Sequence, residues 1–366
     1  MVHLASIIRG GTELADIEKR CLRVYEEHGV GEVIWLLTGS CNLRCIHCYV
    51  EAPSVYNELT TTETLKIARE LAELGVPVVF LSGGEPLMRR DLFEILSTLN
   101  ECNILTVLSC NGQLLGRDIV RRLRRCGVWF IAVPIYGPPW LHDHLTGTDG
   151  SFKRVIEAIK ACISEGVNVC VKTLVTSHSY VYIPRLLETC LDMGVKAFYV
   201  CDLINTGRAK SLRSDRIPPA RWRKLVDYLV ELTRKFKVEV DIGAMPSAAP
   251  YLIKRLGDSK MPLPSCPAGR GLIAITPSGK VVPCNFLLEV EIGDLRSTSL
   301  KEIIRSSGVL KRLRSPRGFK GPCGECRFSE LCGGCRAKAY FSGDLEGSDP
   351  TCLLRAGKKA SLGPVT

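Results

Sequence analysis

Six short apolar segments alternate with amphipathic segments in the first two thirds of the chain, and this alternation restricts the possible folds more than any other feature. The apolar segments predict strands over residues 31–38, 76–82, 104–109, 128–135, 167–175 and 196–201, and the segments between them predict helices over residues 59–75, 91–102, 117–126, 151–166 and 183–194. Continuous apolar strands joined by helices are typical of a parallel sheet with right-handed crossovers. A closed barrel needs eight such units. The sequence therefore predicts an α/β fold, an open or partial (β/α)6 barrel.

The alternation ends near Asn205, and the character of the chain changes after it. A basic segment with prolines and a further helix over residues 220–236 lead into a region dominated by Cys, Gly and turn residues. We therefore expect an N-terminal segment (1–30), a barrel core (31–242), and a bridging region with a small C-terminal domain (243–366) that bound metal largely holds together. The basic tail after Cys352 is expected to be frayed.

The composition is that of a globular protein long enough for two domains. The 366 residues are 46% hydrophobic and 24% charged, which excludes a disordered or fibrous chain. No apolar run is long enough to span a bilayer, so we expect a cytoplasmic protein with no membrane partner. A formal net charge of +11 favours acidic partners, namely nucleic acid, a membrane surface or a polycarboxylate ligand.

Cysteine occupies 18 positions, and two groups of these are closely spaced. In an intracellular chain of this length such a content indicates metal or redox chemistry more than disulfides. The first group follows the first predicted strand and consists of Cys41, Cys45 and Cys48. Three thiolates are an odd number for a tetrahedral zinc site, whereas on a four-iron cubane they leave one iron without a protein ligand.

The C-x3-C-x2-C spacing of these cysteines is followed, after the second predicted strand, by a Gly-Gly-Glu-Pro segment formed by Gly83, Gly84, Glu85 and Pro86. Both motifs, on a six-fold βα core, resemble the radical S-adenosylmethionine (SAM) superfamily. The resemblance implies a [4Fe-4S] cluster on the three cysteines and a SAM molecule that chelates its open iron. It further implies reductive cleavage of SAM to a 5′-deoxyadenosyl radical, with the electron coming from a donor such as ferredoxin or flavodoxin.

The same resemblance assigns further SAM contacts. Glycines at 83 and 84 let the backbone approach the ligand, and Glu85 accepts a hydrogen bond from its ammonium group. Asn111, with Gly112, resembles a ribose or carboxylate contact, although Asn-Gly is also a common turn. His47 and Tyr49 flank Cys48 in a position that contacts adenine, and Tyr49 alternatively packs beneath the loop.

One departure concerns the end of the fourth predicted strand. Relatives commonly have Ser-x-Asp-Gly there, whereas this chain has Pro-Ile-Tyr-Gly, with Tyr136 as the third residue. Beyond it, His142, Asp143 and His144 are expected in a loop on the side where a barrel's active site opens. Tyr136, His142 and Asp143 are therefore the candidate catalytic residues, and exposed loop histidines are the alternative.

Seven cysteines lie in the C-terminal region, four of them as C-x2-C-x5-C-x2-C. Zinc ribbon, ferredoxin-like clusters and disulfides all remain open on spacing alone. The surrounding pattern resembles the SPASM extension of radical SAM enzymes, which implies two auxiliary iron–sulfur clusters. Carried across by position, one cluster takes Cys266, Cys284 and Cys335, and the other takes Cys323, Cys326, Cys332 and Cys352. A shorter third gap and the absence of an extra cysteine leave the first of these with an open or non-cysteine fourth site, or make it a smaller cluster. The other eight cysteines are interpreted as small buried hydrophobes, with disulfides as the alternative.

Several longer strings, among them CGGCRAKAYFSGDLEGSDPTC and INTGRA, resemble the SPASM branch that modifies tetrapyrroles in alternative haem and haem d1 biosynthesis. That resemblance implies a siroheme-derived substrate that loses acetate or undergoes oxidative decarboxylation. Arg208 is a candidate partner for the substrate's carboxylates, or a solvated loop cation. Peptide crosslinking is the alternative activity, made less favourable because only about 30 residues precede the first strand. Cluster thiolates reduce the net charge to about +7, and 7% aromatic content gives no sign of nucleic-acid binding.

Overall fold

The computed structural model describes residues 2–3, 15–50, 57–257 and 264–355, and the statements below concern those residues. Residues 1 and 4–14 of the expected N-terminal segment, and residues 356–366 of the tail expected to fray, lie outside them. Eleven strands of the described chain form one sheet, in the order β1-β8-β7-β6-β5-β4-β3-β2-β9-β10-β11. Because β1 and β11 are the two ends of this order, hydrogen bonds do not close the barrel.

The strands are β1 (Val2–His3), β2 (Val30–Thr38), β3 (Val78–Gly83), β4 (Leu105–Ser109), β5 (Val128–Pro134), β6 (Asn168–Val175), β7 (Ala197–Asp202), β8 (Glu239–Gly243), β9 (Gly271–Ile275), β10 (Lys280–Val282) and β11 (Gly293–Asp294). The α-helices are α2 (Ala15–His28), α3 (Thr61–Glu73), α4 (Leu92–Glu101), α5 (Arg117–Arg125), α6 (Pro139–Thr146), α7 (Ser151–Ser164), α8 (Ile183–Asp192), α9 (Pro219–Phe236), α10 (Ala248–Leu256), α11 (Leu300–Ser306), α12 (Gly308–Leu313) and α13 (Arg336–Tyr340).

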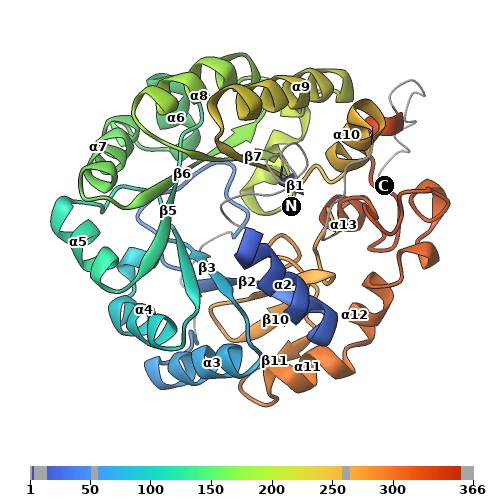
Figure 1. Ribbon diagram of the computed structural model, residues 1–366, viewed down its shortest axis with the longest axis horizontal. Coiled ribbons are helices and arrows are strands. Elements are labelled where there is room, and N and C mark those ends of the chain that lie inside the picture. The colour runs from blue at the N-terminus through green and yellow to red at the C-terminus, as the bar shows by residue number, and fades with distance from the viewer. Residues whose placement is uncertain (1, 4–14, 51–56, 258–263, 356–366) are drawn as a thin grey trace.

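The α/β barrel predicted from the sequence is confirmed, and it is extended by one strand. Strands β2 to β7 are the six expected strands and pair in parallel, and β8 adds a seventh parallel strand beside β7. The capping box predicted at the start of α3 is present, because Thr60 accepts from the Glu63 N–H and Glu63 accepts from the Thr60 N–H. In Figure 1 helices α3 to α9 lie around the outside of the strands.

The C-terminal region is part of the same sheet and the same core. Strand β9 pairs in parallel with β2, so that Ile275 is the partner of Trp35. Ile273 on β9 and Leu310 on α12 belong to the apolar cluster that also contains the barrel strands. Figure 1 shows α11, α12 and α13 on the side of the ring that the βα units leave uncovered. Apolar burial and strand pairing therefore contribute directly to the stability of this region.

Helix α2 covers the amino-terminal end of the barrel interior. Its Ile17 and Cys21 pack with Val78 and Val107, which lie on the inner face of the strands. Parallel barrels carry their functional groups at the opposite, carboxyl-terminal end of the strands. Within the described residues, no helix is both long enough and apolar enough to cross a membrane.

Candidate functional site

The three clustered cysteines lie in the loop that follows β2 at the carboxyl end of the barrel. The thiol groups interact electrostatically with one another: burial and then the charges of Cys48 and Cys41 raise the pKa of Cys45 to about 12. The N–H of Leu43 donates to the Cys41 sulfur at 3.4 Å. Three thiols held together in this way are disfavoured as free thiolates and are stabilised by a shared cationic centre.

The Gly-Gly-Glu-Pro segment packs directly on this loop, and the glycines make the approach possible. The N–H of Gly84 donates to Thr38 O and the N–H of Glu85 donates to Ser40 O, each at 2.7 Å. A Cβ at Gly84 would lie 2.1 Å from Ser40 O, and one at Gly83, where φ is +131°, would lie 2.4 Å from Thr38 O. Within the described chain, the two glycines therefore serve close packing of backbone on backbone.

The Glu85 carboxylate is fully buried and links two strand ends. Its oxygens accept from the N–H of Leu87 at 3.0 Å and from the N–H of Asn111 at 2.7 Å. Burial raises the pKa of Glu85 to about 7, although these two donors oppose that shift. Glu85 thus ties the segment after β3 to the segment after β4, and any contact with a ligand ammonium group would add to these bonds.

Asn111 lies in a turn and contacts the cysteine loop. The segment turns at Gly112, where φ is +80°. The Asn111 amide group reaches back to the cysteine loop, donating to Asn42 Oδ1 at 2.7 Å and approaching the Cys41 sulfur at 3.8 Å. Asn111 is therefore both part of a turn and a neighbour of the predicted cluster ligands.

Arg208 holds the cysteine loop, a contact that the sequence did not predict. Its Nε donates to Cys45 O at 2.8 Å, and its backbone N–H donates to Cys48 O at 2.9 Å. Gly207 allows this approach, since a Cβ there would lie 2.5 Å from Cys48 O. The guanidinium also lowers the pKa of Cys45, against the effect of burial.

Three rings form a row beside the cysteine loop. The His47 and Tyr136 centroids are 4.4 Å apart in an edge-on arrangement, and those of Tyr136 and His142 are 5.4 Å apart and stacked. His142 lies on α6 and is fully buried, which corrects the expectation of an exposed loop histidine. Burial lowers the pKa of both histidines to about 4, so both are neutral near pH 7.

Asp143 caps helix α7 and has a structural role in this geometry. Its carboxylate accepts from the N–H groups of Gly150 and Phe152 and from the hydroxyl of Ser151, at 2.7 to 2.8 Å. Although burial opposes the shift, these bonds lower the pKa of Asp143. These bonds hold the carboxylate at the start of α7, where a helix N-terminus favours a negative charge.

Tyr49 connects the cysteine loop to the C-terminal region. Its ring lies 4.9 Å from that of Phe286, and its hydroxyl interacts with Asn285 and Ser82. Burial raises the pKa of Tyr49 to about 12. Tyr49 therefore packs between the cysteine loop and the C-terminal region.

The structure brings four C-terminal cysteines together, in the set that the resemblance assigned to one auxiliary cluster. A single pocket is lined by Cys323, Cys326, Cys332 and Cys352. The Asp349 N–H donates to the Cys323 sulfur and the Gly334 N–H donates to the Cys332 sulfur, each at 3.4 Å. Such N–H···S bonds are the usual surroundings of cluster ligands. In the part of the chain that is described, no three His, Cys, Asp or Glu side chains are grouped tightly enough to hold a single metal ion.

The other three C-terminal cysteines are also neighbours. The charge of Cys266 raises the pKa of both Cys284 and Cys335, after the larger effect of burial. All 18 cysteines lie in the described residues and none is paired in a disulfide. Of the eight outside the motifs, Cys201 is the one that interacts electrostatically with Cys284.

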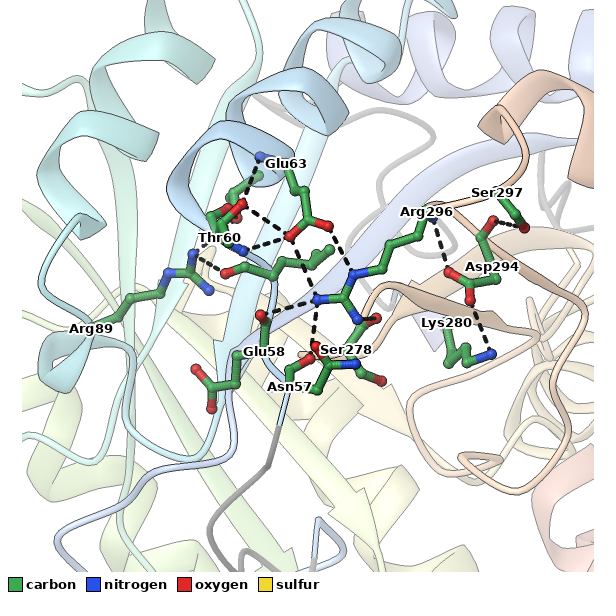
Figure 2. Close-up of polar contacts among 12 residues, drawn as sticks. Asn57, Glu58, Thr60, Glu63, Arg89, Ser278, Lys280, Asp294, Arg296 and Ser297 are labelled. Carbon is green, nitrogen blue, oxygen red and sulfur yellow. Dashed lines mark hydrogen bonds and ion pairs between the residues drawn. The ribbon is translucent and has the colours of Figure 1, made fainter.

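Arg296 links the C-terminal region to the base of the cysteine loop, and no sequence pattern predicted this contact. Figure 2 shows its guanidinium between Glu63 and the backbone before α3, with Nε donating to Glu63 Oε1 at 2.8 Å and Nη2 to Glu58 O at 3.1 Å. Glu58 in turn accepts from the Gly39 N–H at 2.8 Å, where the loop begins. A contact across more than 230 residues cannot be read from local patterns.

Arg89 supports the same loop from the other side. Its guanidinium donates to Leu37 O at 2.7 Å, to Leu59 O at 2.9 Å and to Asp91 at 2.7 Å. Figure 2 shows the Arg89 side chain extending from the segment after β3 to the start of α3. An arginine that satisfies two backbone carbonyl groups and a carboxylate holds the end of β2 in place.

Together these features fit the groups that the motifs imply. Three thiols in the cysteine loop interact with one another, and a backbone N–H group there donates to sulfur. Four further thiols line a separate pocket. Sulfur ligands with N–H donors suit iron–sulfur clusters. Cys41, Cys45 and Cys48 would hold one cluster, and the C-terminal cysteines would hold the others.

Comparison with known proteins places this geometry in a family. The Radical SAM superfamily profile matches residues 35–196, and that of an iron-sulfur cluster-binding domain, SPASM, matches residues 266–336. An AdoMet-dependent heme synthase of Methanosarcina barkeri is 33% identical over 343 residues, 89% of this chain and 97% of that protein. The chain therefore belongs to the radical SAM superfamily and is an S-adenosylmethionine-dependent enzyme with a SPASM region.

Within that family, the tetrapyrrole-related proteins are close relatives. A pre-heme d1 synthase of Dinoroseobacter shibae is 29% identical, covering 88% of this chain and 86% of its own length. A PqqA peptide cyclase of Bradyrhizobium diazoefficiens is 28% identical, with coverages of 88% and 86%. The crystal structure of Streptococcus suis SuiB bound to the precursor peptide SuiA superposes with a TM-score of 0.73 at 19% identity, covering 93% of this chain and 80% of SuiB, which shows the shared fold.

Proposed function

We propose that this enzyme, acting in the cytoplasm, modifies a side chain of a siroheme-derived tetrapyrrole in haem or haem d1 biosynthesis, by acetate loss or oxidative decarboxylation. The observation that carries the proposal is the 33% identity to an AdoMet-dependent heme synthase over nearly the full length of both proteins. When bound, the first cluster and SAM supply a carbon-centred oxidant that removes a hydrogen atom from the substrate. An electron donor such as ferredoxin or flavodoxin would provide the reducing electron.

We assign the following roles to residues of this chain. Cys41, Cys45 and Cys48 hold the first cluster, and Arg208 fixes their loop through the Cys45 carbonyl group. The segment 83–86 and Asn111, which contact that loop, would bind SAM beside it. The row formed by His47, Tyr136 and His142 excludes water from one side of the site.

The C-terminal cysteines would hold two auxiliary clusters. Cys323, Cys326, Cys332 and Cys352 supply four ligands to one, and Cys266, Cys284 and Cys335 supply three to the other. Three four-iron clusters correspond to about 12 iron atoms per chain. Iron and sulfide analysis of the anaerobically reconstituted protein tests this number, and about eight iron atoms would leave room for one auxiliary cluster alone.

The substrate is tested by incubating the reconstituted enzyme with SAM, a reductant and either iron-coproporphyrin III or a siroheme derivative. We expect a shift of the Soret band on binding, and a porphyrin product formed together with 5′-deoxyadenosine. Absence of porphyrin binding, with SAM cleavage intact, would contradict the proposal.

A second candidate activity is crosslinking of a ribosomal peptide. It is favoured by the 28% identity to a PqqA peptide cyclase. A peptide substrate would leave the Soret titration without effect and would raise 5′-deoxyadenosine formation when the peptide is added. The two candidates therefore give opposite results in the same pair of assays.

A further inference from the structure

Lys172 is a cation in the interior of the barrel, on a strand that is otherwise apolar or weakly polar. Residues along β6 alternate: Val171 and Val175 are buried against the helices, whereas Cys170, Lys172 and Leu174 keep partial exposure on the opposite face. Because successive side chains of a strand point to opposite faces, this second face is the inner one. Lys172 therefore points into the barrel.

Its position along the strand places it directly beneath the site. Lys172 pairs in register with Pro134 on one side and Tyr199 on the other. Its ammonium group donates to the hydroxyl of Ser109, at the carboxyl end of β4. Ser109 lies two residues before Asn111, and Pro134 lies two residues before Tyr136. The charge thus sits between the segments that flank the predicted cofactor.

The described residues provide no carboxylate within ion-pair distance of Lys172. Glu85 is the acid that interacts with it electrostatically, but both Glu85 oxygens accept from backbone N–H groups. The thiol groups of Cys110 and Cys201 also lie near the ammonium group, but burial raises the pKa of both far above neutral, so neither supplies a negative charge. A hydroxyl alone is a weak partner for an ammonium group, and burial lowers the pKa of Lys172, so an anionic ligand beside it would stabilise the charged form.

A short series of contacts connects Lys172 with the cysteine loop. Its ammonium group donates to Ser109, and Asn111, two residues further along the same strand end, donates to Asn42 and approaches the Cys41 sulfur. A ligand that lies between the loop and the barrel floor would therefore meet the ammonium group. A ligand carboxylate in that place would provide the missing counter-charge and a charge-assisted hydrogen bond.

We propose that Lys172, held by Ser109, is a carboxylate-binding residue of the active site, and that its ligand is a carboxylate side chain of the substrate. The inference deepens the proposed function, on which the identity of the substrate rests. The amino-acid carboxylate of SAM has the same chemistry, and binding measurements separate the two sources.

The test uses the reconstituted full chain and its Lys172→Gln variant. The dissociation constant of iron-coproporphyrin III is obtained from the Soret shift and that of SAM from equilibrium dialysis. Loss of one charge-assisted contact should weaken porphyrin binding about ten- to a hundredfold and leave SAM binding unchanged. The tetramethyl ester of the same porphyrin, which has no carboxylate charge, should bind both proteins equally.

Two further variants keep the test decisive. Lys172→Arg retains the charge and should bind the porphyrin within a few-fold of the unaltered enzyme, even where the glutamine variant folds poorly. Lys160 on α7 is exposed, and Lys160→Gln serves as a matched control that should change neither dissociation constant.

Each outcome then has one meaning. Weakened SAM binding with unchanged porphyrin binding assigns the carboxylate to SAM and supports the carboxylate site. If the unaltered enzyme binds no porphyrin, the proposed function fails, and SAM binding alone then tests whether Lys172 binds a carboxylate. Unchanged binding of both ligands in a folded Lys172→Gln protein overturns the inference.

Discussion

Replacing Gly84 by alanine tests whether the Gly-Gly-Glu-Pro segment and the cysteine loop depend on close backbone packing. The added Cβ would lie 2.1 Å from Ser40 O, closer than any real contact, so the two segments must separate. Separation removes the hydrogen bonds from the Gly84 and Glu85 N–H groups to the loop, at about 1 kcal/mol each. Steric strain in a packed region adds about 1–3 kcal/mol.

We therefore expect Gly84→Ala to lower the free energy of unfolding by about 3–5 kcal/mol. The assay is urea unfolding of the reduced apo-protein followed by far-ultraviolet circular dichroism, with linear extrapolation to water. The reconstituted variant should also hold less iron, because the loop of Cys41 to Cys48 moves. Gly318 is a matched control, since a Cβ there would meet nothing within 4 Å. A Gly84→Ala protein as stable as Gly318→Ala, with full iron content, would show that close backbone packing at Gly84 is not required.

Three further predictions concern residues around the same loop. Because burial raises the pKa of Glu85 to about 7 from 4.5, the native protein loses stability as the pH rises through that window. The stability deficit of Glu85→Gln should thus be larger at about pH 5 than at about pH 8 in urea unfolding, and a constant deficit would contradict this. Asp143→Ala should cost about 1–2 kcal/mol near neutral pH through loss of the α7 cap. The pKa of Asp143 is lowered in the native protein, so the stability that its carboxylate contributes is lost in acid, and the cost should shrink as the pH falls below 3.8. A cost that persists in acid would contradict this role of Asp143. Arg208→Gln should make the midpoint potential of the first cluster more negative by about 40 mV, measured by electron paramagnetic resonance titration, whereas exposed Arg213→Gln should leave it unchanged. Equal potentials in the two variants would contradict the role given to Arg208.

The barrel core could be predicted because its determinants are local. Continuous apolar strands and amphipathic helices fixed the positions of β2 to β7 and the helices between them, and the capping box at Thr60 gave the start of α3. The cysteine spacing likewise predicted that its three thiols lie together, because a C-x3-C-x2-C run in one loop brings them close in any fold. Helix α6 could also have been recognised, since Pro139 lies in its first turn and Gly147 ends it in the left-handed region.

The remaining features depend on contacts between distant parts of the chain. The pairing of β9 with β2 joins residues about 240 positions apart, and its apolar sequence does not identify its neighbour. Arg208 and Arg296 both hold the cysteine loop, but an arginine in a loop has the same local appearance whether it is solvated or bonded to a backbone carbonyl group. Lys172 did carry a local signal, a single ammonium group in an apolar strand, whose meaning emerged once the inner face of the barrel was known.

We propose that Cys41, Cys45 and Cys48 hold the cluster at which SAM is cleaved. The most direct test compares the anaerobically reconstituted enzyme with a variant in which all three are alanine and the C-terminal cysteines are intact. With a reductant and SAM, the unaltered enzyme should form 5′-deoxyadenosine, and the variant should form none while keeping its auxiliary iron. Formation of 5′-deoxyadenosine by the variant at the rate of the unaltered enzyme would contradict the claim.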